Sequence, residues 1–95
     1  MAWRTTDRAD EDIAEIEIYG TLTFGRRSAE EYVDDLFAAF DLLAASPRIV
    51  PERSELPGSP RLYPFRSHYI VFELVDEDIL VRRVLHVRRD ITGHL

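Results

Sequence analysis

The stretch ILVRRVLHVRRD, residues 79–90, places four arginines and one histidine among aliphatic residues. Guanidinium groups bind phosphates and carboxylates, and a histidine can transfer protons near neutral pH. The stretch could therefore belong to a nuclease site, to a surface that binds nucleic acid, or to a strand whose charges form ion pairs. A strand has a period of two, so one face would carry Ile79, Val81, Arg83, Leu85 and Val87. The other face would carry Leu80, Arg82, Val84, His86 and Arg88.

Ion pairing is the simplest interpretation of the two central arginines of this stretch. Opposite charges on neighbouring strands attract one another, so Arg82 and Arg83 are expected to pair with Glu73 or with carboxylates of a helix. We rank this structural role above a functional one.

The spacing of the histidines does not indicate a metal site or a catalytic site. The chain has three, His68, His86 and His94, and it has no cysteine, so no metal site is expected. His86 has an arginine close by and could act as a general acid or base, although a histidine on a strand more often has a structural role. No glycine-rich phosphate loop or Ser–His–Asp spacing occurs. We therefore predict no catalytic residue and no cofactor.

Aromatic residues alternate with arginines just before this stretch. Such a surface can stack single-stranded bases, form a protein-interaction edge, or be half of a core. The pattern leaves these three alternatives open for Tyr63, Phe65, Tyr69 and Phe72 with Arg61 and Arg66.

Composition limits the kinds of partner. The 95 residues suffice for a single domain, spanning residues 1–95. A formal net charge of −6 makes direct binding to nucleic acid unlikely, and every one of the 12 basic side chains is an arginine. No apolar run approaches the ~18 residues of a membrane span, so we expect a cytoplasmic protein without membrane contact.

Local signals predict two helices near the N-terminus. Residues 2–5 are expected to form an edge strand, and Thr6 to cap a helix that Gly25 ends. The sequence SAEE, residues 28–31, reads as the capping box of a second helix, which Pro47 stops. The short connection predicts an antiparallel hairpin.

Three strands are expected to follow a proline-rich loop at residues 47–60. Turn residues at 66–67 and 76–78 divide the strands Arg61–Phe65, His68–Val75 and Ile79–Val87. The predicted class is α+β with the order β-α-α-β-β-β.

The chain as a whole resembles the ParE branch of the RelE/ParE superfamily of toxin–antitoxin modules. The resemblance rests on four segments in this order: TDRADEDIAEIEIYGTLTFG, SAEEYVDDLFAAFDLLAASP, RSHYIVFEL and RVLHVRRDITGHL. It implies a helical hairpin packed on a small curved antiparallel sheet. It also implies a type II toxin that forms a hetero-oligomer with a cognate, ParD-like antitoxin.

The resemblance leaves two targets, DNA gyrase for ParE-like members and ribosome-bound mRNA for RelE-like nucleases. The absence of lysine, Tyr69 beside His68 and the tail GHL favour a gyrase inhibitor that is not an enzyme. The alternatives are a ribosome-dependent endoribonuclease and a degenerate toxin that only binds its antitoxin.

Two residue sets follow from this interpretation. The candidate target-binding residues are Arg82, Arg83, His86, Arg88, Arg89 and His94. The candidate antitoxin-binding residues are Ile18, Tyr19, Leu22, Phe37, Phe40, Arg61 and Arg66. An apolar groove would accept an amphipathic helix, and the arginines would attract an acidic antitoxin segment. For Phe37 and Phe40, a place in the core is the favoured alternative.

Overall fold

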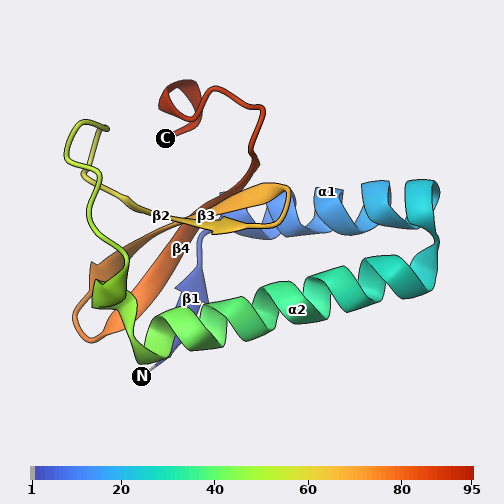
Figure 1. Cartoon of the computed structure of the whole chain (residues 1–95), viewed down its shortest axis with the longest axis horizontal. Helices are drawn as coiled ribbons and strands as arrows, with labels where there is room; N and C mark the ends of the chain where they lie inside the picture. The colour runs from blue at the N-terminus through green and yellow to red at the C-terminus, as the bar shows by residue number, and fades with distance from the viewer. Residues whose placement is uncertain (1) are drawn as a thin grey trace.

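The computed structural model describes residues 2–95 and shows a helical hairpin packed against one face of a four-stranded sheet (Figure 1). The elements in chain order are β1 (Trp3–Thr5), α1 (Asp7–Phe24), α2 (Arg26–Ala45), β2 (Arg61–Phe65), β3 (His68–Val75) and β4 (Asp78–His86). Two 3-10 turns occur at Pro47–Ile49 and Thr92–His94. The predicted class and element order are confirmed, and β4 lies one residue earlier at each end than predicted.

The sheet has the strand order β1-β4-β3-β2 and is mixed. β3 is antiparallel to both β2 and β4, whereas β1 pairs in parallel with residues Ile79–Val81 of β4. The resemblance had implied an antiparallel sheet, so the β1 pairing differs from that expectation. Parallel neighbours need a long crossover, and the chain between β1 and β4, which includes the helical hairpin, supplies it.

The first helix begins and ends where the sequence predicts. The Thr6 side chain accepts a hydrogen bond from the Ala9 amide at 3.1 Å and donates one to the Arg82 carbonyl at 2.7 Å. Gly25 ends the helix with a φ of +97°, a conformation that glycine adopts without strain. The cap therefore also fixes α1 to β4.

The second helix begins at Arg26, two residues before the predicted cap. Gly25 alone connects the two helices, and the capping box at Ser28 does not form. Glu31 instead lies 3.5 Å from Arg27, an ion pair between residues one helical turn apart. The helices also approach closely, because a Cβ added to Gly20 would lie only 3.2 Å from the Ala29 Cβ.

The register of β3 and β4 contains a β-bulge at Arg82. Val71 lies opposite Arg83 and Phe72 lies opposite Val81, so the backbone of Arg82 has no residue of β3 opposite it in the register. Val81 and Val84 consequently both pack in the core beneath the helices, while Leu85 faces the opposite side. The strict alternation predicted for residues 79–88 is therefore wrong beyond the bulge.

The sheet separates two apolar clusters. The larger one lies between the sheet and the helical hairpin and includes Phe40, Leu43, Ile70, Phe72 and Ile79. The smaller one lies on the other face and comprises Leu62, Val71 and Leu85, with Leu56, Tyr69 and Ile91 packed against them. Phe72 is buried in the larger cluster, and the half-buried Tyr63, Phe65 and Tyr69 pack against the two clusters, which favours the core alternative for these aromatic residues.

Candidate functional site

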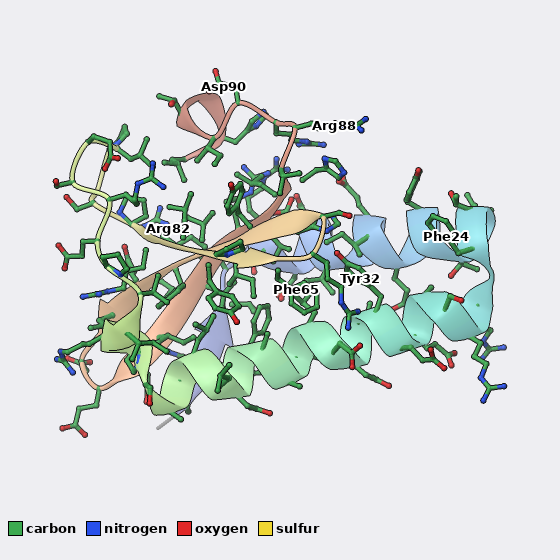
Figure 2. The ribbon with its side chains drawn as sticks, in the orientation of Figure 1. Phe24, Tyr32, Phe65, Arg82, Arg88 and Asp90 are labelled. Carbon is green, nitrogen blue, oxygen red and sulfur yellow. The ribbon has the colours of Figure 1, made fainter. Side chains whose placement is uncertain are left out.

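A hollow of about 700 Å³ lies between the helical hairpin and the end of the sheet where β3 begins and β4 stops. Cavities of this size at the meeting of several elements commonly bind ligands or partner side chains. Figure 2 shows Tyr32 between α2 and the sheet, and Phe24 at the far end of α1. The lining residues are Asp12, Glu15, Ile16, Tyr19, Gly20, Phe24, Ser28, Ala29, Tyr32, Ser67, His68, Val84, His86 and Arg89.

One side of the hollow consists of a tyrosine and two histidines. The Tyr32 hydroxyl and the His68 Nδ1 atom are hydrogen-bonded at 2.6 Å, and the rings of His68 and His86 meet edge to face with centroids 5.4 Å apart. Burial lowers the pKa of His68 to about 4, and the neighbouring His86 acts in the same direction. Burial also raises the pKa of Tyr32. Both partners of this hydrogen bond are therefore neutral at physiological pH.

The depressed pKa of His68 predicts a loss of stability in mild acid. The unfolded chain takes up a proton below the ordinary pKa of 6.5, whereas folded His68 stays neutral until about pH 4. Stability from this group is therefore full above pH 6.5 and is lost as the pH falls toward 4. Because His68 is half-buried and screened by solvent, we expect a loss of about 1 kcal/mol between pH 7 and pH 5. Thermal melts of the wild type, His68→Gln and His94→Gln would check this. An equal pH dependence in all three proteins would contradict it.

The opposite side of the hollow is apolar and continues onto the surface of α1. The far half of the hairpin projects beyond the sheet (Figure 1), so the sheet does not cover the large apolar side chains there and most of their surface is exposed. Ile18, Tyr19, Leu22 and Phe24 are 60%, 66%, 82% and 71% exposed. Three of these four are predicted antitoxin contacts, and the sequence analysis missed Phe24. We call these four residues the hairpin tip.

The other two apolar residues predicted to bind antitoxin lie elsewhere. Phe40 is fully buried, and its ring centroid is 5.0 Å from that of Trp3. Phe37 is half-buried and stacks on Trp3 at 5.6 Å. Phe40 is therefore a core residue, and its predicted contact with a partner is wrong. The favoured alternative, a place in the core, holds for Phe40, whereas Phe37 packs at the edge of the core with part of its ring exposed, so its contact with an antitoxin stays a prediction.

The two arginines predicted to bind antitoxin differ in their availability. The Arg61 side chain is 12% exposed, lies 3.3 Å from Glu52 and donates to the Val50 carbonyl. Arg66 is half-exposed, pairs with Asp35 at 2.7 Å and lies over the Tyr32 ring at 5.5 Å. Arg61 is thus fixed by its own chain, and its proposed role in binding is not supported.

The central arginines of β4 form the ion pairs that the sequence predicts. Arg82 lies 3.3 Å from Glu73 on the surface. Arg83 lies 2.8 Å from Asp12 of α1, and both side chains are more than nine-tenths buried. The hydrogen bonds that Arg83 donates to the Asp12 carboxylate are the main reason that the pKa of Arg83 is raised. Arg83 therefore has a structural role, and its burial does not support the predicted direct contact with a target.

The segment after β4 carries the free charges of this region. Arg88 and Arg89 are exposed, and within residues 2–95 no carboxylate forms an ion pair with either. Arg89 reaches the rim of the hollow, and Figure 2 shows Arg88 on the chain beyond the sheet. His86 lies on the hollow, whereas His94 is half-buried and accepts a hydrogen bond from Arg83 through its carbonyl.

Sequence reasoning missed several residues of the hollow. Tyr32 fits the apolar stripe of α2, and nothing local marks it as the partner of His68, 36 positions away. Asp12 reads as one member of an acidic helix face.

Among residues 2–95, no group of three potential ligands could hold a metal ion, and no helix is long and apolar enough to cross a membrane.

Comparisons with known proteins agree with this geometry. Residues 4–91 match the family described as the ParE toxin of the type II toxin–antitoxin system parDE. Among solved structures, a chain of the chromosomal ParDE system of P. aeruginosa is similar, with a TM-score of 0.80 and 21% identity. The match covers 93% of this chain and 97% of that one. No curated protein matches. The family match spans nearly the whole sequence, and the chain therefore belongs to the ParE family of type II toxins.

Proposed function

We propose that this toxin inhibits DNA gyrase and that a ParD-like antitoxin neutralises it by covering the hairpin tip and the adjoining hollow. The antitoxin part rests on the exposure of the hairpin tip. Four large apolar side chains on one helix end favour burial against a partner, since water-exposed apolar clusters mark interaction sites. Family membership supports an antitoxin as that partner.

The antitoxin proposal predicts that a charge on the hairpin tip weakens the complex. Phe24→Asp places a carboxylate at a position that lines the hollow, so binding of the antitoxin would bury a charge that has no partner. We expect the affinity to fall on the order of 100-fold in calorimetric titration. Leu42→Asp is the matched control, because Leu42 is 53% exposed on α2 and does not line the hollow. Equal effects of the two substitutions would place the antitoxin elsewhere.

The gyrase proposal rests on the family and on the free arginines beyond β4. Arg88 and Arg89 carry two adjacent exposed guanidinium groups that form no ion pair within residues 2–95, and such groups suit an acidic protein surface. No residue has to perform chemistry on this surface, so the toxin acts by binding and not as an enzyme. Arg88 and Arg89 are the main proposed contacts. Arg82, His86 and His94, which are close to them in sequence, are the further candidates for the target-binding surface.

The test is a gyrase supercoiling assay with antitoxin-free toxin. We expect Arg88→Ala/Arg89→Ala to need at least about tenfold more protein for equal inhibition, because charge pairs at interfaces govern association and specificity. Arg26→Ala/Arg27→Ala removes the same charge from side chains that are 85% and 94% exposed at the start of α2, and it should inhibit like the wild type. Absence of inhibition by folded, antitoxin-binding wild type would refute gyrase as the target.

A ribosome-dependent ribonuclease is the second candidate. The Tyr32, His68 and His86 side chains meet in the hollow, and neutral His68 could accept a proton. Cleavage of translated mRNA by the wild type and its loss in His86→Ala would favour this activity over the gyrase proposal.

A further inference from the structure

The end of β4 has an open edge that a side chain completes. β1 ends opposite Val81, so the strand that covers β4 stops there. The next outward amide, that of Val84, donates to Asp12 Oδ2 at 3.0 Å. Asp12 thus takes the place of a strand at this edge, and the same carboxylate binds Arg83 through both of its oxygens, at 2.8 and 3.1 Å.

Arg83 connects this edge to the C-terminal segment. Its Nε and Nη2 atoms donate to Asp12, and its Nη1 atom donates to the His94 carbonyl at 2.8 Å. One guanidinium group therefore joins α1 to the turn Thr92–His94. Its rigid planar fork holds the carboxylate through two donors and the carbonyl through a third, whereas an ammonium group is a single point charge whose donors rotate.

The segment between His86 and His94 is attached at few points. The Val87 amide donates to the Ser67 carbonyl at 2.9 Å, and Ile91 packs against the smaller apolar cluster. Between them, the Arg89 amide donates to the His86 carbonyl at 2.9 Å. The two exposed arginines lie between the end of β4 and Ile91. Without the contact from Arg83, the chain beyond Ile91 would lose its hydrogen bond to β4, and the packing of Ile91 would have to hold the end of the segment. The contact therefore limits how far the arginine-bearing chain can move.

We propose that Arg83 is a positioning residue that fixes the Arg88–Arg89 segment for target binding by holding the His94 carbonyl. The proposal rests on the proposed function, and it assigns Arg83 an indirect role. A binding segment held in one conformation loses less entropy on association, so releasing it should weaken binding while leaving its charges in place.

Two variants separate this role from a general loss of stability. Arg83→Lys keeps a cation beside Asp12 but cannot hold both partners. Deletion of His94 and Leu95 keeps both Arg83 and Asp12 and removes the held carbonyl, together with the two side chains and the His94 amide that donates to the Ile91 carbonyl at 3.0 Å. Because His94 is itself a candidate contact, the exchange of the Arg89 amide, and not gyrase inhibition alone, decides whether the segment is released. Hydrogen exchange of the Arg89 amide, compared with that of the β3 amide of Ile70, reports whether the segment loosens while the sheet stays protected.

We expect both variants to exchange the Arg89 amide about tenfold faster relative to Ile70 and to inhibit gyrase about tenfold less well. A variant that combines Arg83→Lys with the deletion should show no further change, because each change alone already breaks the contact between Arg83 and the His94 carbonyl. Unchanged exchange in the deletion variant, or additive effects, would overturn the proposal. If the wild type does not inhibit gyrase, the proposed target fails, and the exchange measurement still decides whether Arg83 holds the segment.

Discussion

Replacing Asp12 by alanine is expected to lower the free energy of unfolding by about 3–5 kcal/mol, because one partner of a buried ion pair is removed. The Arg83 guanidinium would remain more than nine-tenths buried without its counter-charge. The Val84 amide would also lose its acceptor. For a domain of this size the midpoint of thermal unfolding should fall by more than about 10 °C.

A surface pair on the same strand provides the control. Arg82→Ala breaks the contact with Glu73, and the Arg82 side chain is 47% exposed, so we expect a loss below about 1 kcal/mol. Urea or thermal unfolding of both variants would measure the contrast. A loss under 1 kcal/mol for Asp12→Ala would mean that the pair is dispensable for stability.

Replacing Phe40 by alanine is expected to have a comparable effect through a different cause. Phe40 has no exposed surface, and its ring contacts those of Trp3 and Phe37 at centroid distances of 5.0 and 5.9 Å. Truncation leaves a cavity where helix α2, strand β1 and the sheet meet. Substitutions of this kind cost about 3–5 kcal/mol, since apolar burial is lost and the neighbours relax only in part.

Phe37 on the same helix is the matched comparison. It stacks on the same tryptophan but is only half-buried, so Phe37→Ala should cost about 1–2 kcal/mol. Denaturant titrations of the two variants give the ratio directly. Equal losses would show that Trp3, and not burial depth, determines the contribution of each ring.

Local signals in the sequence account for most of the secondary structure. Thr6 and Gly25 specify the ends of α1 through a side-chain acceptor and a positive φ, which are properties of single residues. The strands β2 and β3 have the predicted bounds because turn residues flank them on both sides. The predicted start of α2 was wrong, because Gly25 is both the C-cap of α1 and the N-cap of α2. Ser28 therefore lies inside α2 and cannot act as its N-cap.

Long-range geometry explains what the sequence could not predict about the site. The bulge at Arg82 changes which residues of β4 face the helices, and no residue type in β4 is specific enough to predict the bulge. Asp12 and Arg83 meet across 71 positions, and their pairing depends on where β1 ends. The exposure of the hairpin tip likewise follows from how far the hairpin extends past the sheet, which periodicity within a helix does not reveal.

The short β1 strand also bears on solubility. A strand edge with an unpaired amide can template the addition of a strand from another molecule, which leads to aggregation. Here the Val84 amide donates to a buried carboxylate, so this amide is not available to a strand of a neighbouring molecule. Asp12 thus acts as a gatekeeper against intermolecular β-sheet formation at an edge that β1 is too short to protect.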